Sequence, residues 1–102
     1  MNKIEGTVYE GAANHFVGIE SVGGRLYLTQ DTLIFVSHGL NIQTHRMDIP
    51  LKDITEINTR NTLGFVPNGL MVYTAAGTQE RFVVNKRKTW IAKINALRDL
   101  PL

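Results

Sequence analysis

The fold is decided by the stretch Gly23-Gly24-Arg25-Leu26-Tyr27-Leu28-Thr29-Gln30-Asp31-Thr32-Leu33-Ile34-Phe35-Val36-Ser37. Two short β-strands are predicted in it, one at 26–29 and one at 33–37. The connection 30–32 is too short and too polar to be anything but a turn. Gly23-Gly24 predicts a second turn just before the first of these strands. The stretch therefore indicates a sheet built of antiparallel hairpins.

Further strands are expected on both sides of this hairpin. They are predicted at His15–Glu20, Thr44–Ile49, Ile54–Arg60, Gly69–Thr74 and Arg81–Val84. In the second of these, Met47 and Ile49 are expected to face inward. Loops are expected at 38–43 and 61–68, and Pro50 either ends a strand or lies at an edge. This spacing of strands and turns indicates an antiparallel meander.

The end of the chain changes to a helical period. Apolar residues recur at offsets of 1, 4 and 7 from the first, at Trp90, Ile91, Ile94 and Leu97. Asn85 is the expected N-cap and Pro101 the expected end of this helix. A small curved sheet cannot bury both of its open ends alone, so the apolar face predicts a helix that plugs one end. The predicted fold class is mainly β: a bent antiparallel barrel of about seven strands capped by one C-terminal α-helix.

The chain totals set limits on domain number and function. A length of 102 residues suits one domain, 1–102, in which 1–10 is either a cover strand or flexible. The formal net charge of +2 permits an anionic partner but is too small for the phosphate footprint of a nucleic-acid reader. The absence of cysteine excludes disulfides, thiolate metal sites and cysteine nucleophiles. No apolar run reaches the ~18 residues of a membrane span, and the first residues lack the apolar core of a signal peptide. We therefore expect a cytoplasmic protein, at most peripheral at a membrane, that needs no cofactor.

The strand pair that decides the fold also carries a family resemblance. Its order is a small-residue turn, an alternating strand ending in Leu28-Thr29, and then Leu33-Ile34-Phe35. Further matching segments follow in order at Glu10–Phe16, Ile49–Ile54, Asn68–Leu70, Phe82–Val84 and Trp90-Ile91. This pattern, over about residues 10–98, resembles the GRAM domain of the pleckstrin-homology-like superfamily, and is most similar to short, stand-alone bacterial proteins of that type.

The resemblance implies a strongly bent sheet of seven antiparallel strands with a C-terminal helix. It also implies a non-catalytic binding module for anionic lipid headgroups or membrane surfaces. The chain departs from the lipid-binding pleckstrin-homology pattern at one point. The predicted turn at Ser21–Gly24 is followed only by Arg25 and not by a basic cluster.

Candidate anion-binding residues are concentrated at the expected start of the helix. Lys86, Arg87 and Lys88 form the densest charge run. Backbone N–H groups and three cations together make an anion site, although cations there oppose the helix dipole. The alternative interpretation is a solvated surface cluster. Lys52 and Arg60 are further candidates, and each basic residue near an anionic surface contributes about 1 kcal/mol.

An apolar segment, Leu63-Gly64-Phe65-Val66-Pro67, has two interpretations. In one, Leu63, Phe65 and Val66 insert into a bilayer or dock on a partner. In the other, the segment folds back over the barrel, because large apolar side chains are costly to leave in water.

The remaining residues favour no catalytic or metal chemistry. His38 and His45 are interpreted as a structural or exposed pair rather than as metal ligands, and His15 as a side chain with its hydrogen bonds satisfied. No nucleophile is paired with a base, and no two carboxylates stand at a recognisable spacing. The sequence therefore predicts a non-enzyme. A membrane binder is the first hypothesis, and a protein-interaction module that uses a strand edge or the apolar loop is the alternative.

Overall fold

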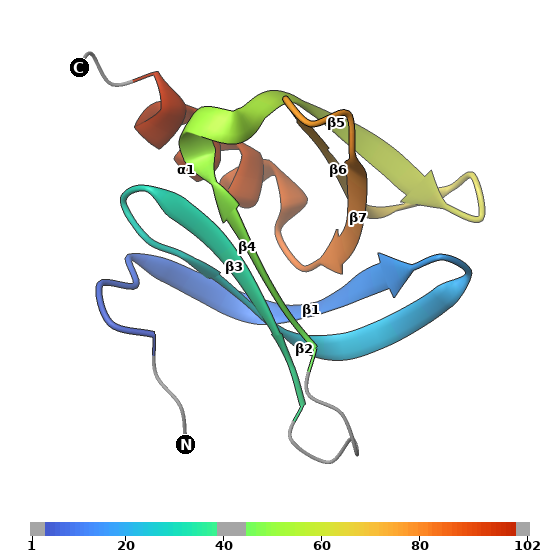
Figure 1. Cartoon of the computed structure of the whole chain (residues 1–102). Coiled ribbons are helices and arrows are strands. Elements are labelled where there is room, and N and C mark those ends of the chain that lie inside the picture. Colours follow the sequence, from blue (N-terminus) through green and yellow to red (C-terminus); the bar gives the residue numbers. More distant parts are fainter. Residues whose placement is uncertain (1–3, 39–44, 100–102) are drawn as a thin grey trace.

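The computed structural model describes residues 4–38 and 45–99. In this part of the chain seven strands, one 3-10 helix and one α-helix follow one another: β1 (Tyr9–Val17), β2 (Glu20–Leu28), β3 (Thr32–Ser37), β4 (Arg46–Pro50), η1 (Leu51–Asp53), β5 (Ile54–Thr62), β6 (Val66–Thr74), β7 (Gln79–Val84) and α1 (Arg87–Arg98). The strands form one antiparallel sheet in the order β4-β3-β2-β1-β7-β6-β5, which curls on itself (Figure 1). The predicted fold class, a curled antiparallel sheet with one C-terminal helix, is confirmed.

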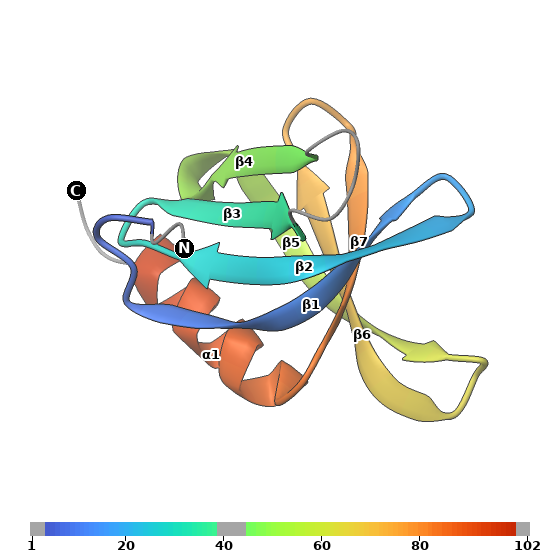
Figure 2. The same ribbon diagram turned by 90° about the horizontal axis from the view of Figure 1, so that it is seen from below.

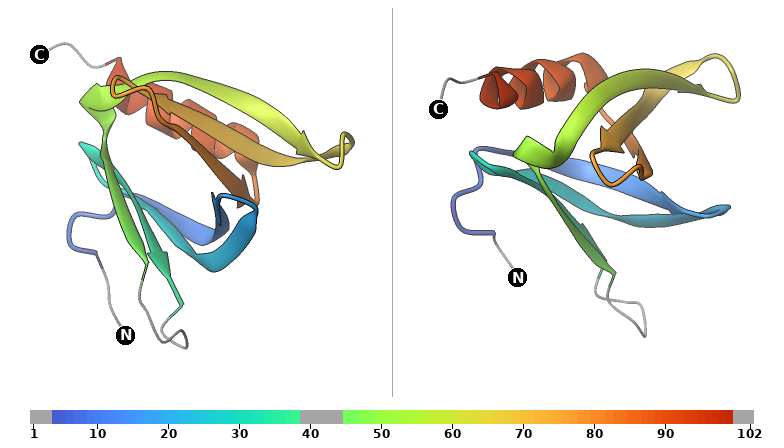
Figure 3. Two further views of the ribbon diagram at one scale, coloured as in Figure 1. Left: turned by 45° about the vertical axis from the view of Figure 1, so that its right-hand side comes forward. Right: turned by 45° about the horizontal axis from the view of Figure 1, so that its top comes forward.

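The helix α1 closes one open side of the curl. Figures 2 and 3 show β1–β4 and β5–β7 running across each other, with α1 packed along the side where they diverge. Trp90 and Ile94 are fully buried, and Ile91 and Leu97 pack against the core, as the helical period predicts. The indole packs over Gly11 of β1, where a Cβ would lie 3.7 Å from Trp90 Cζ2, an ordinary van der Waals distance. The helix is therefore fixed by one apolar stripe on the inner face of the sheet.

The core side chains come from alternate positions of facing strands. Leu26, Leu28, Leu33 and Phe35 of β2 and β3 are at most 1% exposed. They meet residues of the other half of the sheet and of the helix, among them Leu70, Val72, Phe82, Val84, Trp90 and Ile94. In β4, Ile49 is buried and Met47 is partly buried against the core, as predicted. Strand alternation thus places one continuous core inside the curl.

The predicted turn at Ser21–Gly24 is wrong, and the predicted strand at His15–Glu20 is interrupted: residues 15–17 end β1, and residue 20 begins β2. β1 and β2 pair without interruption from Tyr9↔Leu28 to Val17↔Glu20, and the chain turns at Gly18, where φ is +62°. Gly24 lies inside β2, where a Cβ on it would lie only 2.1 Å from the backbone oxygen of Val36 in β3. Gly24 therefore marks a close backbone approach rather than a reversal of the chain.

Two further boundaries differ from the sequence prediction. Residues 61–68, predicted as a loop, form the end of β5, a short turn and the start of β6. The N-cap is Lys86 and not Asn85; its φ is +56°, and within the described residues its side chain makes no capping hydrogen bond. The predicted loop at 38–43, apart from His38, and the predicted stop at Pro101 lie outside the described residues.

Candidate functional site

The tip of the β5–β6 hairpin exposes two large apolar side chains. The turn is closed by the N–H of Gly64, which donates to the oxygen of Asn61 at 3.3 Å, and by that of Phe65, which donates to the oxygen of Thr62 at 3.2 Å. Leu63 is 81% exposed and Phe65 is 74% exposed. The interpretation in which this segment folds back over the barrel is therefore wrong. Both side chains project into solvent, beyond the reach of the core.

Backbone strain accompanies this exposure. Leu63 has a φ of +55°, a left-handed conformation that is unfavourable for a side chain with a Cβ. Val66, at the start of β6, is partly buried and pairs with Thr62. The fold thus holds Leu63 in a strained position at the very tip of the hairpin. Positive φ values at both Leu63 and Gly64 are what a tight hairpin turn requires, so the turn imposes this conformation on Leu63.

A second exposed apolar tip lies at the β1–β2 turn. Ile19 is 99% exposed and Val17 is 47% exposed, on either side of Gly18. Figures 1 and 2 show that the β1–β2 and β5–β6 hairpins project toward the same side of the molecule. The sequence interpretation missed this tip because it placed the turn at residues 21–24. The signal that marks it is Gly18-Ile19, a glycine followed by an apolar residue between two strands.

The basic cluster lies at the base of the β5–β6 hairpin. Lys86 and Lys88 are exposed. Arg87 is partly buried, and its Nη1 donates to the oxygen of Arg60 at 3.3 Å, to Oδ1 of Asn61 at 3.1 Å and to the oxygen of Gly69 at 3.3 Å. Arg87 therefore connects the start of α1 to the hairpin. The structure thus places the backbone of Arg60 beside Arg87, which is flanked by the exposed Lys86 and Lys88 and is itself in a structural position.

Lys52 is not brought to this cluster. It is exposed in η1, and the chain just after it is held at the far end of the helix, where Nη2 of Arg98 donates to the oxygen of Ile54 at 2.9 Å. A helix of twelve residues is about 18 Å long. That length separates Lys52 from the basic residues at the start of α1.

The start of α1 keeps its positive character. Its first turn contains no acidic residue, and its N-cap is itself a lysine. The N–H groups of Thr89 and Trp90 are taken by the oxygen of Lys86, at 3.0 and 3.2 Å. The start of α1 therefore combines the positive end of the helix dipole with two exposed lysines, which favours an anion there.

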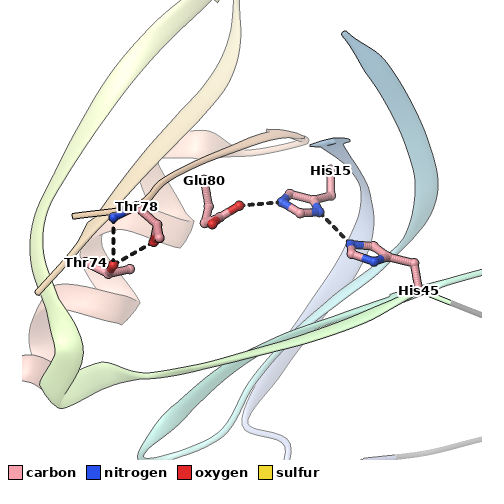
Figure 4. Close-up of polar contacts among 5 residues, drawn as sticks. All are labelled: His15, His45, Thr74, Thr78 and Glu80. Atoms are coloured by element: carbon pink, nitrogen blue, oxygen red, sulfur yellow. Dashed lines mark hydrogen bonds and ion pairs between the residues drawn. The ribbon is translucent and has the colours of Figure 1, made fainter. Parts of the chain in front are cut away.

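A chain of polar side chains on the inner side of the sheet was not anticipated. His15 is 1% exposed; its Nδ1 lies 2.9 Å from Nε2 of His45, and its Nε2 lies 2.9 Å from Oε1 of Glu80 (Figure 4). His45 is thus joined to His15 and not to His38, which lies beside Gly23. Among residues 4–38 and 45–99, no group of three or more His, Cys, Asp or Glu side chains is arranged to hold a metal ion.

One ion pair marks the outer face of β4. Nε of Arg46 lies 2.8 Å from Oδ1 of Asp48, with both side chains about half exposed. The hydrogen bond from Arg46 holds the pKa of Asp48 below its ordinary value, and the same contact raises the pKa of Arg46. The pair therefore gives a short edge strand two charges of opposite sign, which discourages pairing with another strand.

Comparisons with known proteins agree with this architecture. The family model of the GRAM domain matches residues 13–89. The C-terminal domain of an unknown protein from Leishmania infantum has a similar structure, with a TM-score of 0.78 and 16% identity over 90% of this chain and 83% of that one. The Slm1-PH domain in complex with phosphoserine has a TM-score of 0.63 and 13% identity, over 89% and 91% of the two chains.

A third similar structure is part of a larger protein. The DH/PH domains of p115-RhoGEF superpose with a TM-score of 0.70 and 18% identity, over 94% of this chain and 31% of that one. At these identities the likeness establishes the fold. No curated protein matches the chain significantly. In the described part of the chain, no helix is long and apolar enough to cross a membrane.

Proposed function

The chain belongs to the GRAM domain family, and from that membership we propose that it is a non-catalytic module that docks on membranes containing anionic lipid. The proposal is carried by one observation: two hairpin tips with exposed apolar side chains project to the same side, and basic residues lie at the base of one of them. Ile19, Leu63 and Phe65 supply the apolar contact. Arg60, Lys86 and Lys88 supply the charge.

Apolar insertion provides the short-range part of the binding. Full burial of a side chain such as Leu or Phe contributes roughly 1.5–3 kcal/mol. Two separated tips can touch one flat surface at the same time, whereas a compact protein partner would have to bridge the space between them. A bilayer therefore fits the two tips better than a pocket does.

Electrostatic attraction provides the long-range part. Arg60 stands three residues before Leu63, which is about 10 Å along an extended strand. Side chains at that depth reach the headgroup layer when the tip enters the lipid. Each basic residue near such a surface contributes about 1 kcal/mol, and this contribution falls with salt. Arg87 acts by fixing the hairpin to α1.

The similar structures support a phosphate-bearing headgroup as the ligand. Slm1-PH domain structures are described in complex with phosphoserine and with inositol-4-phosphate. Another is described as showing ligand binding in the non-canonical site. We propose the same ligand chemistry here, in a protein of the short bacterial type that is cytoplasmic and peripheral at the membrane.

Co-sedimentation with vesicles tests the apolar part of the proposal. Neutral phosphatidylcholine vesicles are compared with vesicles that also contain phosphatidylserine, for the parent and for a variant with Leu63→Ser and Phe65→Ser. We expect the parent to bind the anionic vesicles and the variant to lose at least tenfold in affinity. Val8→Ser is the control, because Val8 is also exposed, at 52%, but lies before β1, at the other end of the β1–β2 hairpin. Equal losses in variant and control would overturn the proposal.

Charge variants test the electrostatic part. Lys86→Gln with Lys88→Gln is compared with Lys52→Gln with Lys93→Gln, which makes the same change of net charge away from the start of α1. We expect the first pair to weaken binding to anionic vesicles and to reduce its salt dependence, and the second pair to change both much less. If both double variants lose the same affinity and the same salt dependence, only the net charge of the protein matters, and the proposed site at the start of α1 is wrong.

The depth of each tip can be measured separately. Trp90 is the only tryptophan and is 1% exposed, so it is shielded from lipid. A new tryptophan at Phe65→Trp or at Ile19→Trp reports contact with brominated lipid chains by quenching. We expect both tryptophans to be quenched on anionic vesicles. Quenching at residue 65 alone would show that only the β5–β6 tip inserts.

A strand-edge interaction is the second candidate function. β4 and β5 are the two terminal strands of the sheet, so each has one edge without a strand partner in the described structure. The β4 edge is short and carries Pro50 and the Arg46–Asp48 pair. β5 is nine residues long, although register shifts interrupt its pairing near both ends. If the parent protein bound no vesicles but bound an extended peptide along β5, this function would be favoured.

A further inference from the structure

One buried imidazole joins strands that are far apart in the sheet. β4 and β7 are separated in the sheet order by β3, β2 and β1. His45, just before β4, and Glu80 of β7 are nevertheless joined through the ring of His15, with both contacts at 2.9 Å (Figure 4). The ring of His15 packs against Phe82, with centroids 4.8 Å apart, and lies 5.4 Å from the ring of Phe35. The three polar residues therefore cross the interior of the curl.

The direction of the hydrogen bonds follows from the chemistry of the end group. An ionised carboxylate only accepts, so Nε2 of His15 must carry the hydrogen that it donates to Glu80. In neutral His15, Nδ1 is then an acceptor, and Nε2 of His45 must donate to it. Both rings are thereby fixed in the tautomer that carries its hydrogen on Nε2. With no proton added, both hydrogen bonds, His45 to His15 and His15 to Glu80, therefore have a donor and an acceptor.

The same geometry sets how many protons the two rings can hold. One added proton fits, because His45 takes it on Nδ1 while its Nε2 still donates to His15. Two added protons do not fit, because N–H groups of both rings would then face each other across 2.9 Å with no acceptor between them. The two rings would also be like charges beside a single carboxylate.

We propose that His45, His15 and Glu80 form a proton-operated latch, closed with none or one added proton on the two rings and released when both rings are protonated. Release affects the backbone directly. The N–H of Ser37 donates to the oxygen of His45 at 2.8 Å, and the N–H of His45 donates to Oγ of Ser37 at 2.8 Å. When the ring of His45 leaves His15, the backbone of His45 that pairs with Ser37 loses its tie to the core. The latch is independent of the proposed lipid binding.

Charged groups on the neighbouring elements surround the latch unevenly. On β4, Asp48 is held by Arg46. On β7, Arg81 extends over the ring of Phe16, with 4.4 Å between its Cζ and the ring centroid. Asp48 and Asp53 line a surface pocket together with Glu80 and add negative charge to that end of the chain. His38, the remaining histidine, lies beside β2 and is exposed.

Nitrogen NMR of the histidine rings tests the direction of the chain. At neutral pH we expect His15 and His45 both to carry hydrogen on Nε2 in the parent. In Glu80→Gln the amide can donate or accept, so the tautomer of His15 should no longer be fixed. Finding hydrogen on Nδ1 of His15 in the neutral parent would overturn the proposal, and this measurement needs no variant to fold.

Amide hydrogen exchange tests the release. After correction for intrinsic exchange rates, we expect the amides of Ser37 and His45 to stay protected while one proton is taken up, and to exchange roughly tenfold faster or more once the second ring is protonated. In His45→Phe the protection should no longer change with the protonation of His15, and His38→Gln should behave as the parent does. Unchanged protection in the parent with both rings protonated would overturn the latch.

Discussion

The guanidinium of Arg87, in the first turn of α1, donates from Nη1 to the backbone oxygen of Gly69 in β6 at 3.3 Å. The same nitrogen reaches the oxygen of Arg60 and Oδ1 of Asn61 in β5. One side chain thus holds both strands of the hairpin whose tip carries Leu63 and Phe65. A sequence motif that is predicted to bind anions contains a residue that positions the apolar tip instead.

Replacing Arg87 should separate this positioning role from charge. Arg87→Lys keeps the charge, but the lysine nitrogen lies one bond nearer the backbone than Nη1 and should fall short of the three acceptors that Nη1 contacts. We expect the free energy of unfolding to fall by about 1–2 kcal/mol, measured by urea denaturation, because carbonyl groups at the hairpin base lose their donor. Lys88→Gln is the control; it removes a charge from an exposed side chain and should change stability by less than about 0.5 kcal/mol. Equal stability of Arg87→Lys and the parent would contradict the role.

Gly24 should tolerate no side chain, although its neighbour Gly23 should. A Cβ at Gly24 would lie 2.1 Å from the oxygen of Val36 and 2.9 Å from Cζ of Phe35. At Gly23 the nearest atom would be Cδ2 of His38, at 3.4 Å. We expect Gly24→Ala to destabilise the fold by roughly 3 kcal/mol or more and Gly23→Ala by much less. Thermal unfolding of the two variants side by side checks this, and similar melting temperatures would contradict it.

The helix and the central strands were predictable because each carries a strong local period. Trp90 and Ile94 repeat at the helical spacing and are the residues that α1 buries. Leu26, Leu28, Leu33 and Phe35 alternate along β2 and β3. The turn before β2 was misplaced because a glycine pair marks both a reversal and a close approach of two backbones. Only the neighbouring strand, through the oxygen of Val36, decides between these meanings at Gly24.

The candidate site was predictable only in part. The charge run and the apolar segment are visible in the sequence, but exposure of Leu63 and Phe65 depends on how far the hairpin extends past the core. Lys52 is equally basic and lies elsewhere because η1 packs at the other end of α1. The His15–Glu80 contact joins residues 65 positions apart, and no local pattern indicates such a pair.

The ion pair on β4 should make a small contribution to stability that is lost in acid. The pKa of Asp48 is lowered in the folded protein by the hydrogen bond from Arg46. Its contribution is therefore complete above the unfolded pKa, about 3.9, and is lost as the pH falls through the lower folded value. We expect Asp48→Asn to be slightly less stable than the parent at neutral pH, with the difference vanishing as the pH is lowered below about 4.

Urea denaturation at several pH values measures this difference. Salt should reduce it, since both side chains are about half exposed. Arg46→Gln is the matched variant: it removes the other partner and should show the same pH dependence, while the double variant should add little. If the difference in the free energy of unfolding between the parent and Asp48→Asn grew as the pH was lowered, the ion pair would not be its cause.

We expect Leu63, at the tip of the β5–β6 hairpin, to lower the stability of the fold while it strengthens binding to membranes. Leu63 holds a φ of +55°, which costs a residue with a Cβ roughly 1–2 kcal/mol. Asparagine tolerates this conformation, so we expect Leu63→Asn to raise the free energy of unfolding by about 1 kcal/mol while it weakens binding to anionic vesicles. Phe65→Asn is the matched variant, because Phe65 has no positive φ to relieve. It should weaken binding without the gain in stability. Were Leu63→Asn less stable than the parent, the leucine would be held by packing, and its exposure would not be the reason for its presence at the tip.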